Sequence, residues 1–181
     1  MIISAGRNEI FDFALPMGVG LVDMSINLTK FLCENRQSLP SEIIFVGSAG
    51  LYKEGEILKI YESRSAVNCE ISALYELSYS PINYAIIARD SADVSYETIT
   101  NSSNFITTDK KSALKFFERG YFLENMEFFA VLKVAQKFQI PAYGIFCATN
   151  FCDSNAHTDF LKNHAAAKEN LTKYLKTKAL I

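Results

Sequence analysis

Apolar residues occur along this chain in two patterns: short continuous runs, and longer segments in which every third or fourth residue is apolar. The runs are typical of strands, and the longer segments are typical of helices that bury one face. Strands, or apolar runs of strand length, are predicted at Met1–Ala5, Phe11–Leu15, Glu42–Val46, Leu58–Tyr61, Ile82–Ala88, Thr98–Asn101 and Ala142–Ala148. Helices are predicted at Leu21–Glu34, Lys110–Arg119 and Ser154–Lys178.

The stretch from Glu124 to Asp153 organises the rest of the prediction. Its first part predicts a further helix, because apolar residues follow one another in steps of three or four at Leu123, Met126, Ala130, Val134 and Phe138. Glu127 points into that apolar stripe, and a buried carboxylate is costly unless something binds it. The alternative is a partner elsewhere, such as an arginine, or a helix face that is less buried. After Pro141, the run Ala142–Ala148 suits a strand covered on both faces.

Four of the predicted strands end in small or polar clusters, at Arg7–Glu9, Gly47–Gly50, Asn101–Phe105 and Thr149–Asn150. In open α/β sheets, ligands bind just beyond the carboxyl ends of the strands. We therefore expect an α/β sandwich with one crevice lined from several strand ends. Two local alternatives stay open. The glycines around Ser48 either approach a ligand or only turn the chain, and Phe105 either stacks on a base or plugs the core edge.

Composition and charge narrow the class of protein. The chain has 181 residues, of which 49% are hydrophobic and 21% charged, and this predicts a single globular domain over residues 1–181. The net charge of −2, without a basic stripe, argues against a nucleic-acid partner. No apolar run is long enough to span a bilayer, so no membrane partner is expected. The chain starts directly as a strand with no basic leader, which favours a cytoplasmic location.

The cysteines and histidines do not predict a metal site. The four cysteines lack the spacing of zinc ligands, and Cys147 lies in a strand that is expected to be buried. His157 and His164 lie near the start of the last helix without a metal partner at ligand spacing, so surface positions are expected for both. No metal ion or organic cofactor is predicted.

Four short motifs follow one another along the chain: GVG at Gly18–Gly20, GSAGL at Gly47–Leu51, SNFITTD at Ser103–Asp109 and NMEFFAV at Asn125–Val131. Their order resembles the purine nucleoside phosphorylase and methylthioadenosine (S-adenosylhomocysteine) nucleosidase family. The resemblance covers most of the chain, and IISAGRNE at its start resembles the family's first strand. It implies a three-layer αβα sandwich around a mixed central β-sheet, and cleavage of the N-glycosidic bond of a purine nucleoside by water or by phosphate. It also implies a homo-oligomer, at least a dimer.

The resemblance assigns roles to individual residues. Glu9 stands where the hydrolases carry the carboxylate that activates water, and Glu127 with Met126 would hold the ribose. Phe105 would stack on the purine, and the backbone of Ile106 would contact its edge. The remaining pocket residues implied by the resemblance are Ser48, Ala49, Gly50 and Thr149.

Asn150 departs from the family pattern. The hydrolases and many phosphorylases have Ser-Asp where this chain has Thr149-Asn150, and that aspartate is the usual acid toward the purine N7. An asparagine cannot give up a proton in the same way, but its amide can hydrogen-bond N7 or a 6-oxo group. Asn150 therefore implies either a preference for inosine- or guanosine-like substrates or a weakened enzyme. The alternative function is a nucleoside-binding relative without turnover. If phosphate is the co-substrate, Arg7, Arg64 and Arg89 are the candidate phosphate ligands.

Overall fold

The structure, a computed structural model, describes residues 1–87 and 97–181. Arg89 and the end of the predicted run at Ala88 lie outside the described residues. The strands are β1 (Ile2–Ser4), β2 (Leu15–Pro16), β3 (Ile43–Leu51), β4 (Ile60–Val67), β5 (Ala85–Ile87), β6 (Glu97–Ser102), β7 (Leu123–Asn125) and β8 (Ala142–Phe151). The helices are α1 (Gly20–Glu34), α2 (Ile71–Leu74), α3 (Lys110–Glu118), α4 (Phe128–Phe138) and α5 (Ala156–Thr177).

The central sheet is mixed, and part of it closes on itself. β3 pairs in parallel with β1 and β8 and antiparallel with β7. β4 pairs antiparallel with β8 and β5 and in parallel with β6, which in turn lies parallel to β7. The strands β3, β8, β4, β6 and β7 therefore form a ring, and β1, β2 and β5 extend it.

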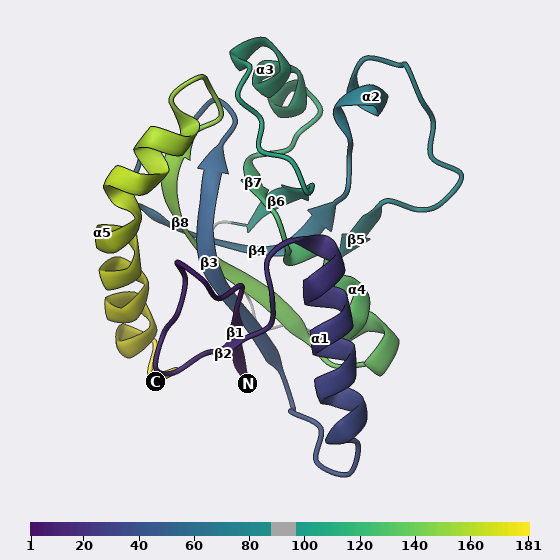
Figure 1. The fold of residues 1–181 in the computed structure, drawn as a ribbon, viewed down its shortest axis with the longest axis vertical. Coiled ribbons are helices and arrows are strands. Elements are labelled where there is room, and N and C mark those ends of the chain that lie inside the picture. Colours follow the sequence, from purple (N-terminus) through teal and green to yellow (C-terminus); the bar gives the residue numbers. More distant parts are fainter. Residues whose placement is uncertain (88–96) are drawn as a thin grey trace.

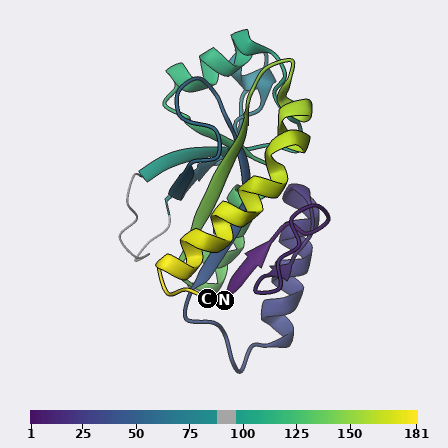
Figure 2. The same cartoon turned by 90° about the vertical axis from the view of Figure 1, so that its left-hand side faces the viewer.

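Helices cover both faces of the sheet, as Figures 1 and 2 show. α5 packs along β8 and β3 on one face, whereas α1 and α4 pack against each other on the opposite face. Successive residues of β8 point to opposite sides, so Phe146 belongs to the core beneath α4 and Ile145 to the core beneath α5. The predicted three-layer αβα sandwich around a mixed sheet, and a β8 covered on both faces, are confirmed.

The helix that was predicted from Leu123 begins only at Phe128. Leu123–Asn125 form strand β7 instead, and Glu127 occupies the position just before the helix. The cause is Asn125, whose side-chain Oδ1 accepts hydrogen bonds from the backbone N–H groups of Glu127 (2.8 Å) and Phe128 (2.9 Å). A side chain that satisfies these free donors starts a helix at that point.

Strands β3 and β8 continue beyond their predicted ends. β3 runs through Gly47–Leu51 and stays paired with β8 as far as Phe151, with one irregularity between Ala49 and Gly50. Gly47–Gly50 is therefore not a turn, and Thr149 and Asn150 belong to the last part of a strand. The reason is mutual pairing, which the separate sequence segments do not reveal.

Candidate functional site

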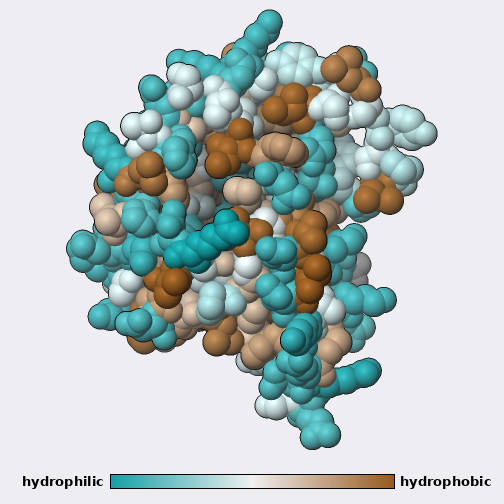
Figure 3. All heavy atoms as spheres, viewed as in Figure 1, coloured by the Kyte–Doolittle hydropathy of each residue, from teal (hydrophilic) through white to brown (hydrophobic). Residues whose placement is uncertain are grey.

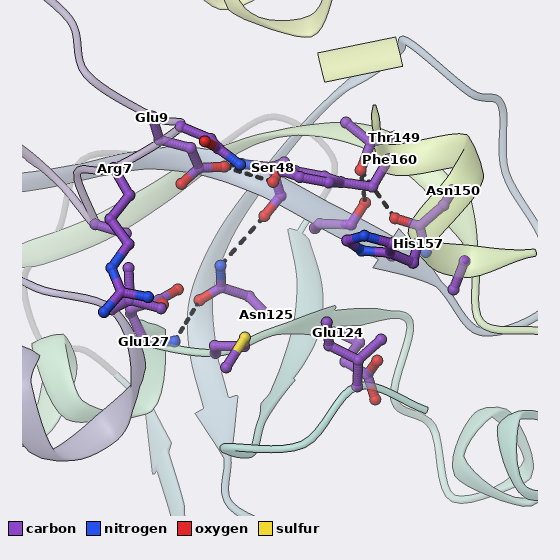
Figure 4. A pocket seen from close by; sticks show the side chains of 18 of the residues that line it. Arg7, Glu9, Ser48, Glu124, Asn125, Glu127, Thr149, Asn150, His157 and Phe160 are labelled. Carbon is purple, nitrogen blue, oxygen red and sulfur yellow. Dashed lines mark hydrogen bonds between the residues drawn. The ribbon is translucent and has the colours of Figure 1, made fainter. Parts of the chain in front are cut away.

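A cavity of about 270 Å³ opens where several strands end (Figure 4). One end contains Arg7, Glu9 and Glu127, and the other contains Asn150, His157 and Phe160. The lining comes from the turn after β1, the second halves of β3 and β8, the β7–α4 junction and the start of α5. The remaining lining residues are Ala5, Gly6, Asn8, Val19, Ser48, Ala49, Gly50, Ile106, Glu124, Asn125, Met126, Thr149 and Ala156.

Glu9 is fixed at the acidic end of the cavity by Ser48. Its Oε1 accepts hydrogen bonds from the Ser48 backbone N–H (2.6 Å) and from the Ser48 hydroxyl. The turn that presents Glu9 is held by the Ser4 hydroxyl, which donates to the Glu9 carbonyl at 2.8 Å, and it places Arg7 at a φ of 53°. Burial raises the pKa of Glu9, and the bonds from Ser48 oppose that rise. This carboxylate is therefore oriented and is able to accept a proton.

Glu127 is the second carboxylate at this end, and its side chain is only 3% exposed. Its Oε1 accepts a hydrogen bond from the backbone N–H of Gly20 at 2.8 Å, at the start of α1. Burial, and then the negative charge of Glu9, raise the pKa of Glu127 to about 7. The predicted burial of Glu127 is thus correct, and its partner is a backbone donor rather than an arginine.

Asn125 bonds to the backbone of Glu127 and to that of Ser48, the residue that holds Glu9. Besides starting α4, its Nδ2 donates to the carbonyl oxygen of Ser48 at 3.2 Å. One amide therefore positions the backbone of Glu127 and the strand that carries Ser48. The sequence prediction gave Asn125 no role, because its two partners lie on separate segments.

Asn150 lies at the opposite end and is tied to its own strand. Its Oδ1 accepts from the Thr149 hydroxyl at 2.9 Å, and its Nδ2 donates to the carbonyl of Phe151 at 3.0 Å. Gly50 packs directly against this amide, since a Cβ there would lie 3.1 Å from Asn150 Nδ2 and 2.9 Å from Cys152 Sγ. The glycine is needed for close approach rather than for a turn.

Glu124 is a third buried carboxylate, and sequence reasoning missed it. It accepts hydrogen bonds from the Thr107 backbone N–H (2.9 Å), the Thr107 hydroxyl, the Tyr52 hydroxyl (3.1 Å) and the Cys152 thiol (3.6 Å). Burial raises the pKa of Glu124. The bonds to Thr107 anchor the segment that brings Ile106 to the cavity.

The structure brings together every predicted site residue except Phe105. Glu9, Ser48, Ala49, Gly50, Ile106, Met126, Glu127, Thr149 and Asn150 all line the cavity. Phe105 does not line it, and its side chain is 74% exposed. His157 and Phe160 line the cavity as well. His157 is exposed on the helix surface, as predicted, but its position at the cavity was not predicted. The spacing of three residues between His157 and Phe160 at a helix start places them on one face, a signal that could have identified them.

Among residues 1–87 and 97–181, no three histidine, cysteine or acidic side chains gather as metal ligands. No helix in the described part of the chain is long and apolar enough to cross a membrane.

Comparison with known proteins gives structural matches only. No protein-family model matches the chain, and no curated protein matches it in sequence. A 5′-methylthioadenosine nucleosidase mutant from Helicobacter pylori, solved with 5′-methylthioadenosine in its active site, has a TM-score of 0.79 at 17% identity. The match covers 97% of this chain and 95% of that chain.

Two further solved structures are similar over nearly their whole length. A futalosine hydrolase mutant from H. pylori has a TM-score of 0.78 at 16% identity, covering 97% of this chain and 95% of that one. A putative 5′-methylthioadenosine/S-adenosylhomocysteine nucleosidase from Borrelia burgdorferi, bound to adenine, has a TM-score of 0.76 at 18% identity, covering 99% of each chain. The structural similarity over nearly the whole chain establishes the fold, and the predicted nucleoside phosphorylase-like architecture is confirmed.

Proposed function

We propose that this chain cleaves the N-glycosidic bond of a purine nucleoside. The observation that best supports this proposal is the cavity, which has two carboxylates at one end and an amide and an imidazole at the other. The fold supports the proposal, since similar solved structures include nucleosidases with adenine or 5′-methylthioadenosine bound. No metal or organic cofactor takes part in the proposed reaction.

The acidic end suits the ribose. As the bond to the base breaks, positive charge develops on the sugar, and carboxylates nearby stabilise it. Glu127 accepts from the ribose hydroxyls in this proposal, beside Met126. One oxygen of Glu127 is already oriented by the Gly20 N–H, so the carboxylate loses little freedom on binding.

Glu9 is the proposed general base. Its carboxylate is oriented by two donors of Ser48, and its raised pKa makes it a better proton acceptor than an exposed glutamate. Glu9 takes the proton from a water molecule whose oxygen bonds to the sugar C1′. The purine departs with the electron pair of the broken bond.

The other end suits the purine. Asn150, Thr149 and Gly50 lie there, with Ile106 on the segment anchored by Glu124. The Asn150 Nδ2 carries a second hydrogen besides the one that it donates to Phe151, and this hydrogen can bond to N7 or a 6-oxo group. We therefore favour inosine- or guanosine-like substrates.

Phosphate is the alternative nucleophile, because Arg7 lines the cavity close to the sugar end (Figure 4). Of the three arginines considered, Arg64 does not line the cavity and Arg89 lies outside the described residues. A nucleoside-binding protein without turnover is the second alternative, because Asn150 replaces an acid.

The test is an assay of released base by reversed-phase chromatography. Purified protein is given inosine, guanosine, adenosine and methylthioadenosine, each with and without phosphate, and Glu9→Gln serves as the inactive reference. Base released without phosphate supports hydrolysis. Base released only with phosphate assigns phosphorolysis and directs attention to Arg7. No base release by folded protein that still binds hypoxanthine or adenine would reject the enzyme proposal.

The proposal includes a homodimer. Apolar side chains gather over part of α1 in Figure 3, where Val22 and Ile26 are 60% and 59% exposed. The side chain of Asn104 accepts a hydrogen bond from Leu21 N–H at 2.9 Å, so the segment that carries Phe105 adjoins the same helix. Light scattering of the wild type and of a Val22→Glu, Ile26→Glu double variant tests this: a dimer that becomes a monomer supports it, and a monomeric wild type rejects it.

A further inference from the structure

Breaking the bond to a purine requires a proton at the purine end of the cavity. The leaving base carries the electron pair of the broken bond, and a positioned acid that protonates it contributes roughly 10²- to 10⁴-fold in rate. Asn150 cannot be this acid, because a carboxamide does not release a proton in the accessible pH range. Its Oδ1 is moreover held by Thr149 and one hydrogen of its Nδ2 by Phe151, so that it can offer the purine only a hydrogen bond.

Glu124 is the third carboxyl group that lines the cavity, besides Glu9 and Glu127, and its geometry does not suit the task. Four protein donors, from Thr107, Tyr52 and Cys152, point at its two oxygens. A carboxylate has about four acceptor positions in all. Glu124 is therefore occupied as an acceptor and directs no proton into the cavity.

His157 is free of such restraints. It lies in the first turn of α5 and lines the same end of the cavity as Asn150 and Phe160 (Figure 4). Within the part of the chain that the structure describes, no hydrogen bond or ion pair holds this ring. His157 is also exposed on its outer side, so that solvent can return a proton to it after each turnover.

We propose that His157 is the general acid of this site, an assignment that rests on the proposed cleavage of a purine nucleoside. The imidazolium gives its proton to N7 of the purine while the bond from C1′ to N9 breaks. Glu9 takes a proton from the attacking water, whose oxygen bonds to C1′, and both side chains then exchange with solvent. The net change is nucleoside plus water to ribose plus purine.

The charged groups that share the cavity with His157 are Arg7, Glu9, Glu124 and Glu127. On its own segment, Asp153 precedes α5 and Asp159 follows two residues later. Because several of these groups titrate, a pH profile alone would not single out His157. The leaving group is the better variable, because an acid is needed only where the leaving group is basic.

The experiment compares two substrates in the His157→Asn variant. Inosine or methylthioadenosine releases a purine that needs a proton, whereas p-nitrophenyl riboside releases a stable phenolate. We expect kcat/KM for the nucleoside to fall by about 100-fold and kcat/KM for p-nitrophenyl riboside to stay within about threefold of wild type. His164→Asn, on the same helix but outside the cavity, is the matched control. Circular dichroism confirms that each variant is folded.

A second arm adds Asn150→Asp to the His157→Asn variant. A carboxylic acid at position 150 would return an acid to the purine end, so we expect recovery of about tenfold in nucleoside cleavage. Equal loss on both substrates would make His157 a structural residue, and an unchanged nucleoside rate would reject it altogether. If the wild type releases base from no nucleoside, the proposed cleavage of a purine nucleoside is rejected. If the wild type is active and the His157→Asn variant is equally active, only the role of His157 as general acid is rejected.

Discussion

The carboxylate of Glu127 accepts its hydrogen bond from the backbone N–H of Gly20, a residue 107 positions earlier in the chain. Gly20 has a φ of 85°, which an L-residue rarely adopts, and this conformation aims its N–H at the cavity. The first helix is therefore connected to the site through its backbone. Its neighbour Leu21 donates to the side chain of Asn104, two residues before Ile106 of the cavity lining.

Gly20→Ala should both destabilise the protein and impair the site. A Cβ there would lie 2.9 Å from Asn104 Oδ1, in addition to the strain of a positive φ, which costs on the order of 1–3 kcal/mol. Urea denaturation and kcat/KM for the best nucleoside measure the two effects.

Gly120→Ala is the matched control, because Gly120 has a φ of 87° and open space around it. It should lose stability from backbone strain alone and keep its activity. Equal losses of stability and activity in both variants would contradict a specific role for the contact between Gly20 and Glu127.

The free energy of unfolding should fall as the pH rises from about 5 to 7. The folded protein holds the proton of Glu127 up to a pKa of about 7, whereas the unfolded chain releases it near 4.5. The folded state thus binds more protons in this window, and its stability decreases with pH by up to about 3 kcal/mol. Urea titrations at several pH values measure this.

Glu127→Gln should flatten that dependence without abolishing it, because burial also raises the pKa values of Glu9 and Glu124. The activity of the wild type should show the opposite trend, with kcat/KM rising toward neutral pH as Glu127 becomes charged. An identical slope of stability against pH in wild type and variant would contradict the assignment to Glu127.

Ser48→Ala should slow catalysis less than Glu9→Gln. The variant loses the hydroxyl donor to Glu9 but keeps the backbone N–H donor. A hydrogen bond to a charged group is worth about 1.5–3 kcal/mol, which corresponds to roughly 10- to 100-fold in kcat. Steady-state kinetics provide the measurement.

Ser25→Ala is the control for this variant, since its hydroxyl donates to the Leu21 carbonyl at 2.7 Å outside the cavity. It should leave kcat unchanged. A Ser48→Ala enzyme with the rate of the wild type would show that the hydroxyl does not orient Glu9.

Asn150→Asp should shift the preference from 6-oxopurine to 6-aminopurine nucleosides. An oxygen in place of Nδ2 would face the carbonyl of Phe151 at about the present 3.0 Å, so the new carboxyl would favour its protonated form. The variant loses the Nδ2 donor to a 6-oxo group, whereas its carboxyl oxygen can accept a hydrogen bond from a 6-amino group. We expect the ratio of kcat/KM for adenosine to that for inosine to rise by about tenfold.

Asn170→Asp removes a similar amide donor, which bonds to the Leu58 carbonyl at 3.0 Å far along α5. It should leave the ratio unchanged. If Asn150→Asp leaves the ratio of kcat/KM for adenosine to that for inosine unchanged, position 150 does not distinguish 6-amino- from 6-oxopurines.

The sequence predicted the parts of the fold that depend on local pattern. The helical period around Met24 and Leu28 and the apolar run of β8 were sufficient for α1 and β8. The boundary between β7 and α4 was wrong because an Asn125 side chain overrides the apolar period there. The closed ring of strands could not be predicted, since it depends on pairings between distant segments.

In the candidate site, too, local patterns were predicted and contacts between distant segments were not. Glu127 was identified because a charged residue interrupts an apolar stripe, which is a local signal. Glu124 was missed because its partners Tyr52 and Thr107 come from other segments. The stacking role given to Phe105 stays a prediction, and it would require the exposed ring to turn toward the cavity.

The closed ring of strands also affects how the protein is made. β3 pairs with β8 along its whole length, from Ile43 with Ala142 onward, so this edge of β3 stays unpaired on the ribosome until most of the chain has been synthesised. Long-range strand pairing is slow, and an apolar unpaired edge attracts other chains. The yield of active protein in cells should therefore depend on growth temperature and on chaperones that shield nascent chains.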